Sequence, residues 1–218
     1  MKLFNILLFC VALNQIQAQD WANLTRYSLE NKTLLTSEQT IEAVFFGNSI
    51  TEGWPQFNPT FFKEHNFIGR GIGGQTTPQL LLRFRQDVLG LRPKKVILLA
   101  GINDIAQNTG PISLNAIMDN IISMAELASA NGVEMILCSV LPVNYFPWRP
   151  EIIPTQMVIE LNQKINAYAQ KMNLVYVDYY IHMANTEKGL KDYLGYDTVH
   201  PNKAGYEVME KVLLTYLK

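Results

Sequence analysis

Cysteine is scarce in this chain of 218 residues, which contains only Cys10 and Cys138. Cys138 lies in the apolar run 135–140, where a lone thiol is usually buried. Cys10 falls in an N-terminal stretch that has the pattern of an export signal, so a processed chain would keep one cysteine and form no disulfide. The sequence therefore predicts a protein stabilised by its hydrophobic core rather than by covalent cross-links.

Neither sign of charge is in excess, because 18 Lys and Arg stand against 19 Asp and Glu, for a net charge of −1. Without a basic surplus to neutralise a phosphate backbone, we predict no nucleic-acid partner. Long apolar runs are also lacking, since none reaches the roughly 18 residues that span a bilayer. The 48% hydrophobic content nevertheless suffices for a sizeable core and excludes a disordered chain.

The first residues have the pattern of a cleaved signal peptide. Lys2 precedes the stretch 3–13, which is apolar except for Asn5, and Ala18 suits a cleavage site. A buried N-terminal helix or strand is the alternative. Because the bulky Phe9 precedes Cys10, a lipid anchor is not supported. We expect a signal peptide over residues 1–18, a secreted or periplasmic protein without a stable membrane anchor, and one domain over residues 19–218.

Short β-rich runs alternate with longer helical stretches. The strands are expected at 42–46, 67–68, 95–100, 134–140 and 174–177, and the helices at 78–89, 113–131, 155–172 and 204–217. Strands that are apolar on both faces indicate a parallel sheet covered on both sides. The alternation predicts an α/β protein with three layers, α/β/α, in which polar motifs gather at the carboxyl ends of the strands.

Three polar motifs begin where predicted strands end. They are Gly-Asn-Ser-Ile-Thr-Glu-Gly at 47–53, a glycine-rich turn at 69–77, and Gly-Ile-Asn-Asp at 101–104. A fourth, Asp-Thr-Val-His-Pro at 197–201, lies before the last helix. The glycine-rich turn also formally fits a dinucleotide fingerprint, but it does not follow the first strand, and no acidic residue ends the next one. We therefore predict no nucleotide. Because the sequence has no His-Glu-x-x-His motif and no clustered Cys and His, we also predict no metal, and we expect no other cofactor.

The four motifs together carry the groups that acyl transfer needs. Ser49 is a candidate nucleophile and His200 its general base, while Asp197 would hold the other ring nitrogen of the imidazole. The N–H groups of Ser49 and Gly74 and the amide of Asn103 are candidate donors to an oxyanion. Taken singly, each of these residues is more often a turn or capping residue.

The order of these motifs resembles the SGNH (GDSL-type) hydrolases, over nearly the whole chain after residue 18. The resemblance implies a flavodoxin-like fold with a five-stranded parallel sheet, a metal-free serine esterase, and the site residues just named. The turn at 69–77 is similar to that of the branch holding platelet-activating-factor acetylhydrolase subunits and exported bacterial carbohydrate acetylesterases. Two positions depart from the family pattern, since Asn48 and Gln75 stand where members usually carry Asp.

Residues that would contact the substrate are less clearly marked. Tyr145, Trp148 and Arg149 follow the fourth predicted strand and suit a substrate wall, although their aromatic rings suit inward packing equally well. Trp54 is a candidate wall of the acyl pocket or a core residue. Arg70 and Arg149 are candidate contacts for an anionic group.

The resemblance leads us to predict an exported esterase that hydrolyses short-chain acyl esters, preferably acetyl esters on carbohydrates. Its partner would be a small-molecule or glycan ester. Two alternatives stay open. One is a lysophospholipase or thioesterase, and the other is a catalytically silent glycan-binding module, which the changes at Asn48 and Gln75 suggest. The oligomeric state is unknown from the sequence.

Overall fold

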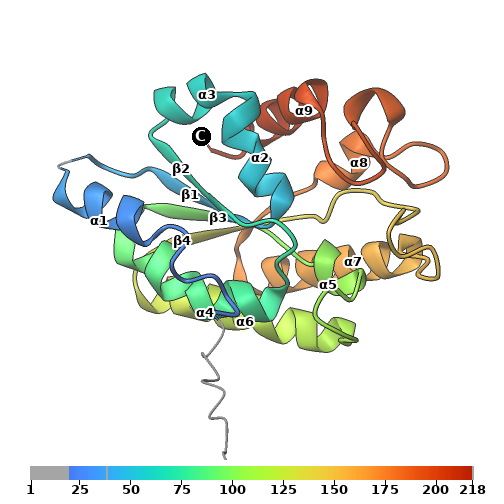
Figure 1. Ribbon diagram of the computed structural model, residues 1–218, viewed down its shortest axis with the longest axis horizontal. Helices are drawn as coiled ribbons and strands as arrows, with labels where there is room; N and C mark the ends of the chain where they lie inside the picture. Colours follow the sequence, from blue (N-terminus) through green and yellow to red (C-terminus); the bar gives the residue numbers. More distant parts are fainter. Residues whose placement is uncertain (1–19, 38, 218) are drawn as a thin grey trace, which may run out of the picture.

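The computed structural model describes residues 20–37 and 39–217, and its centre is a five-stranded parallel sheet in the order β2-β1-β3-β4-β5 (Figure 1). The predicted signal peptide of residues 1–18 lies outside the described residues. The strands are β1 (Ala43–Gly47), β2 (Phe67–Gly71), β3 (Lys95–Leu99), β4 (Glu134–Cys138) and β5 (Val175–Val177). The predicted α/β fold with a five-stranded parallel sheet is thereby confirmed.

Helices cover both faces of the sheet (Figure 1). One layer contains α2 (Ser49–Phe57), α3 (Pro59–Glu64), α8 (Tyr179–Met183) and α9 (Lys203–Leu214). The other contains α4 (Thr77–Asp87), α5 (Ile102–Ile105), α6 (Leu114–Ala130) and α7 (Thr155–Met172), with α1 (Ser28–Thr36) beside α4. Two short 3-10 turns, η1 (Leu89–Leu91) and η2 (Asp192–Leu194), complete the described elements.

Each strand supplies side chains to two separate cores. Phe45 and Ile97 pack under α2 and α9, whereas their neighbours Phe46 and Leu98 pack against α4 and α6. This alternation explains why the strands carry apolar residues on both faces, since a parallel sheet is buried on both faces. No helix in the two described ranges is both long enough and apolar enough to cross a membrane.

The second strand is longer than the sequence predicts, because it continues through the glycine-rich stretch as far as Gly71. Glycine is required there by close packing rather than by an unusual backbone angle. A Cβ atom on Gly71 would lie 2.1 Å from the backbone nitrogen of Glu52 and 2.6 Å from the carbonyl oxygen of Asn48. The first turn of α2 therefore rests directly on the end of β2.

The outer edge of β2 is closed by side chains. Tyr27 donates its hydroxyl hydrogen to the carbonyl of Gly71, and Arg70 Nη1 donates to the carbonyl of Gly69 at 2.8 Å. Arg70 is only 3% exposed and its Nε also donates to Asn31 at 2.9 Å. The structure thus corrects the prediction that Arg70 contacts an anionic substrate, since its guanidinium is engaged within the protein.

The register of the sheet brings the predicted motifs together. Gly47 at the end of β1 lies beside Gly71 of β2 on one side and Leu99 of β3 on the other. The segments that follow these three residues therefore leave the sheet at one edge, as parallel strands require.

Candidate active site

Ser49 is the first residue of α2, directly after β1. The preceding residue, Asn48, caps the helix, because its side-chain oxygen accepts a hydrogen bond from the backbone nitrogen of Ile50 at 3.2 Å. At this position Ser49 shares the positive end of the helix dipole, where developing negative charge is stabilised. Asn48 therefore orders the turn even though it lacks the negative charge of the usual Asp.

Ser49, His200 and Asp197 form a continuous chain of hydrogen bonds. The distance from Ser49 Oγ to His200 Nε2 is 2.9 Å, and that from His200 Nδ1 to Asp197 Oδ2 is 2.8 Å. The other oxygen of Asp197 accepts from the backbone nitrogens of His200 at 2.6 Å and of Val199 at 2.8 Å. Side chains from the two ends of the chain thus meet in the order that nucleophilic catalysis requires.

The pKa of Asp197 is held below its ordinary value. Partial burial alone would raise this pKa, but the hydrogen bonds from the backbone of His200 and Val199, together with the His200 ring, outweigh burial. The carboxylate is therefore ionised where it faces the imidazole. In addition, the exposed ring of Tyr196 stacks on His200, with 5.5 Å between ring centroids and 7° between planes. No pattern in the sequence predicts this contact.

Two of the candidate oxyanion donors, Gly74 and Asn103, lie in segments that contact each other, and a Cβ atom on the neighbouring Gly73 would lie 3.9 Å from Cβ of Ser49. Gly74 adopts a φ of +75°, a left-handed conformation that glycine favours. Asn103 is buried at 5% exposure, and its Nδ2 donates to the carbonyl of Gln75 at 3.0 Å, which leaves the second hydrogen of the amide for another acceptor. Within the described ranges, neither the N–H of Ser49 nor that of Gly74 donates to a protein acceptor.

A buried arginine that the sequence analysis missed connects the loops at this edge. Arg83 is fully buried and donates to the carbonyl of Gly47 at 2.8 Å, to Gln75 Oε1 at 2.6 Å and to Asp87 at 3.1 Å. Gln75 in turn donates to the carbonyl of Ala22 at 2.7 Å. A signal was present in the sequence, since Arg83 and Asp87 are four residues apart on the helix face that also carries Leu80 and Phe84.

Asp104 has a structural position beside Asn103. Its carboxylate accepts from the backbone nitrogen of Thr77 at 3.0 Å and from the Thr77 hydroxyl at 2.6 Å, so it fixes the start of α4. Burial raises its pKa to about 6, and the hydrogen bonds from Thr77 limit the rise. In the part of the chain that the structure describes, no group of three or more His, Cys, Asp or Glu side chains is arranged to hold a metal ion.

The residues predicted to contact the substrate differ in exposure, since one is buried in the core and the others lie at the surface. The structure corrects the prediction for Trp54, whose ring is 1% exposed in the core and whose indole N–H donates to Glu210 at 3.0 Å. Tyr145 and Trp148 are instead about half exposed, at 45% and 46%. Arg149 is also partly exposed, and its Nη1 lies 3.5 Å from Oε1 of Glu151. Because Thr198 Oγ1 donates to the carbonyl of Tyr145 at 2.9 Å, the 144–150 loop lies beside the loop of Asp197.

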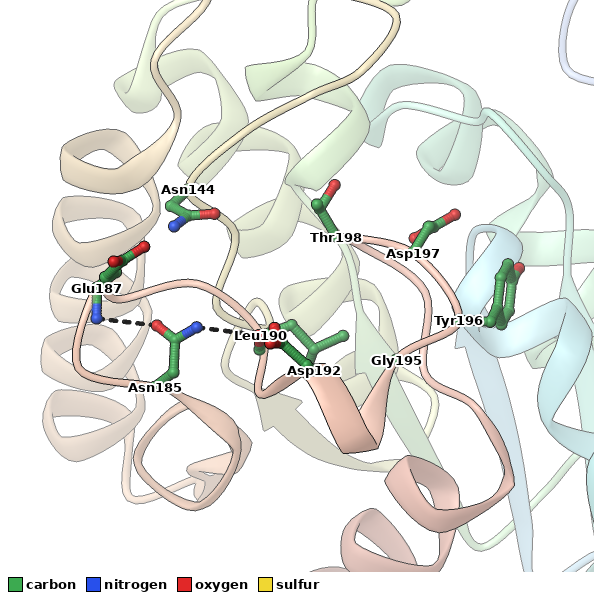
Figure 2. Close-up of a pocket in the computed structure, with 9 residues that line it drawn as sticks. All are labelled: Asn144, Asn185, Glu187, Leu190, Asp192, Gly195, Tyr196, Asp197 and Thr198. Carbon is green, nitrogen blue, oxygen red and sulfur yellow. Dashed lines mark hydrogen bonds between the residues drawn. The ribbon is translucent and has the colours of Figure 1, made fainter.

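A pocket of about 380 Å³ opens next to the Asp197 loop. Figure 2 shows Asn144 and Glu187 on one side of it and Thr198, Asp197 and Tyr196 on the other. Most of its lining side chains are polar. The pocket therefore shares Asp197 and Tyr196 with the surroundings of His200.

Comparisons with known proteins identify the family to which this chain is similar. The profile of the GDSL-like Lipase/Acylhydrolase family matches residues 45–208, which include Ser49 and His200. A crystal structure of a protein assigned as an acylhydrolase from Bacteroides fragilis is 44% identical, with a TM-score of 0.88 over 91% of this chain and 97% of its own. A GDSL-like lipase from Bacteroides thetaiotaomicron is also 44% identical, with a TM-score of 0.86 over 90% of this chain and 97% of its own.

Two further proteins are similar to this chain over a smaller share of its length. An acetylxylan esterase from Geobacillus stearothermophilus shares the fold at 18% identity, with a TM-score of 0.64 over 80% of this chain and 93% of its own. An uncharacterised lipoprotein of Bacillus subtilis, YqeF, is 32% identical over 81 residues, which are 36% of this chain and only 33% of that protein. The family profile and the two Bacteroides structures confirm the resemblance in the motifs. The chain belongs to the GDSL-like lipase/acylhydrolase family and is a carboxylic ester hydrolase.

Proposed function

We propose that Ser49, His200 and Asp197 are the catalytic triad of an exported esterase that removes short acyl groups, acetyl above all, from carbohydrates. The observation that carries the proposal is the unbroken hydrogen-bond chain of 2.9 and 2.8 Å between these three side chains. A serine hydroxyl is a weak nucleophile at neutral pH unless a base accepts its proton, and Nε2 of His200 is placed to do so.

The reaction proceeds through an acyl-enzyme in two steps. Ser49 Oγ attacks the ester carbonyl while His200 takes its proton, and His200 then protonates the departing alcohol. Water activated by His200 next releases the acid and regenerates Ser49. Asp197 fixes the tautomer of the ring and stabilises the imidazolium that forms. The N–H groups of Ser49 and Gly74 and the amide of Asn103 hold the oxyanion, and loss of one such donor typically costs about 3 kcal/mol of transition-state stabilisation.

The preference for acetylated carbohydrates is supported by the chemistry of one pocket. The pocket beside Asp197 is lined mainly by polar side chains, which suit a hydroxyl-rich alcohol better than an acyl chain. A lysophospholipase or thioesterase would instead need an apolar channel for its long acyl group.

A series of nitrophenyl esters from acetyl to octanoyl, assayed with the wild type and with Ser49→Ala, tests the proposal. We expect the fastest hydrolysis for acetyl, a steep fall with chain length, and no activity in Ser49→Ala. Rates that rise toward octanoyl would favour the lysophospholipase or thioesterase. A fluorophosphonate probe should label the wild type but not Ser49→Ala. Absence of labelling in both would instead indicate the silent glycan-binding module.

Export and domain organisation form part of the same proposal. We infer that residues 1–18 are removed and that residues 19–218 make a single hydrolase domain. Support comes from the apolar stretch behind Lys2 and from the name of the partly matching lipoprotein. Expression of the full chain in a bacterial host, followed by N-terminal sequencing of the exported protein, tests this. The expected first residue is Gln19, and an intact N-terminus inside the cell would contradict the proposal.

A further inference from the structure

We propose that the pocket beside Asp197 binds the alcohol portion of the ester and selects neutral or cationic alcohols over anionic ones. This inference rests on the proposed function, because it assigns a selectivity to the same site. The pocket lies close to Ser49, as binding of the alcohol portion requires. The Asp197 carboxylate lines the pocket, and it is separated from Ser49 Oγ only by the His200 ring and two hydrogen bonds of 2.9 and 2.8 Å. One or two sugar rings attached to an ester at Ser49 would span that separation.

The lining of the pocket carries charge of one sign only. Glu187, Asp192 and Asp197 contribute carboxylates, and none of the described residues that line the pocket is Lys or Arg (Figure 2). Lys191, in the same loop, is directed away, since its Nζ donates to the carbonyl of His182 at 2.8 Å. Anionic groups such as uronates or phosphates would therefore meet repulsion here, whereas hydroxyl groups find many acceptors.

The neutral polar groups of the pocket are held in place from behind. A Cβ atom on Gly189 would lie 2.6 Å from Cγ and Oδ1 of Asn144, so the absence of a side chain at Gly189 leaves the space that the Asn144 amide occupies. Thr198 is fixed by its hydrogen bond to Tyr145 at 2.9 Å. The Asn144 amide can thus offer both a donor and an acceptor to hydroxyl groups, and the Thr198 oxygen can accept from a position that its hydrogen bond already sets.

Steady-state kinetics on three acetyl esters tests the assignment. The substrates are nitrophenyl acetate, which is too small to fill the pocket, an acetylated neutral xylo-oligosaccharide and an acetylated oligogalacturonate. The variant Glu187→Gln/Asp192→Asn removes two charges from exposed side chains. The control, Asp119→Asn/Glu126→Gln, removes two exposed charges from α6 in the opposite layer.

We expect the wild type to prefer the neutral oligosaccharide over the anionic one. At low salt, Glu187→Gln/Asp192→Asn should reduce this preference about tenfold, mainly through a higher kcat/KM for the anionic substrate. Nitrophenyl acetate, which does not reach the pocket, measures in every variant how far the hydrolytic activity itself is preserved. Gly189→Ala, which displaces the Asn144 amide without burying a charge, should lower kcat/KM for both oligosaccharides, because both carry the hydroxyl groups that this amide would bind. The control should match the wild type on all three substrates.

The possible failures are distinguishable. A wild-type enzyme that hydrolyses nitrophenyl acetate but neither oligosaccharide overturns the pocket assignment and leaves the esterase in place. The pocket assignment is also overturned, and the esterase kept, if Glu187→Gln/Asp192→Asn prefers the neutral over the anionic oligosaccharide as strongly as the control does. A wild type that hydrolyses none of the three esters overturns the proposed function itself and the pocket assignment with it.

Discussion

At the scale of single residues, the two nitrogens of the His200 ring face different groups: Nε2 faces Ser49 Oγ and Nδ1 faces Asp197 Oδ2. Asp197 accepts three hydrogen bonds, two from backbone nitrogens and one from the ring, so its position and its charge are both fixed. These hydrogen bonds keep the pKa of Asp197 low in spite of partial burial, and the carboxylate stays ionised as the reaction requires.

Asp197→Asn should lower kcat on nitrophenyl acetate by roughly a thousandfold or more, with a much smaller change in KM. The amide can keep its oxygen on the backbone nitrogens, and its NH2 group then faces Nδ1. The ring would have to carry its proton on Nε2, where it cannot accept the proton of Ser49. Asp119→Asn, on the exposed face of α6, serves as the control. A kcat for Asp197→Asn within tenfold of this control would contradict the assigned role.

Asp104 predicts a particular pH dependence of stability. Its pKa is raised to about 6 by burial, against an ordinary value near 4 in the unfolded chain. Between these values the folded state binds more protons, so stability falls as pH rises and the loss is complete above about pH 6. The wild type should therefore lose up to about 3 kcal/mol relative to Asp104→Asn between pH 4 and pH 7. Urea unfolding at both pH values measures this difference, and a constant difference would argue against it.

At the scale of elements, one buried side chain ties together two of the four segments that form the site. Arg83 of α4 binds the carbonyl of Gly47, which ends β1, and the side chain of Gln75, which follows Gly74. The segment before the candidate nucleophile and the one bearing a candidate oxyanion donor are thus tied to the same guanidinium. Gln75 fits this role because a neutral amide can accept from Arg83 and donate to Ala22 at once.

Arg83→Lys should lower kcat at least about tenfold, with little change in KM, and should reduce the melting temperature. Lysine keeps the charge opposite Asp87 but cannot reach three separate acceptors in the planar geometry of a guanidinium. Arg85→Lys is the matched control, because Arg85 lies on the exposed face of the same helix. If Arg83→Lys loses stability but keeps the full kcat, Arg83 is a structural residue and does not position the site.

At the scale of the whole molecule, stability depends on two hydrophobic cores, one on each face of the sheet. The predicted absence of cross-links in the processed chain has a measurable consequence. Cys138 is 2% exposed at the end of β4, and burial raises the pKa of its thiol to about 12. The thiol is therefore both inaccessible and protonated at neutral pH.

Purified protein lacking residues 1–18 should have the same melting temperature with and without a reductant. A thiol reagent should react with about one group per chain in denaturant and with almost none under native conditions, since only Cys138 remains. Rapid labelling of the native protein would show that the end of β4 opens easily and would contradict its place in a rigid core.

Much of the fold was readable from the sequence, and the reason is the period of the apolar residues. Runs such as 96–99 and 135–138 are apolar on both faces, which is typical of strands in a parallel sheet. The helix over Ser49–Phe57 was harder to predict, because Gly53 and Pro55 lie within it and both weaken helices. The extension of β2 was missed for a related reason, since Gly71 is set by contact with α2 rather than by local preference.

The sequence by itself determined the candidate chemistry, because Ser49, Gly74, Asn103, Asp197 and His200 lie in motifs whose order resembles one family. Tertiary structure alone decided which side chains serve the site and which serve the core. Trp54 and Arg70 point into the protein, while Arg83 binds the distant Gly47 and the pocket joins Asn144 to the 185–198 segment. Local patterns report the face of a helix or strand, whereas contacts between distant segments depend on how the layers pack.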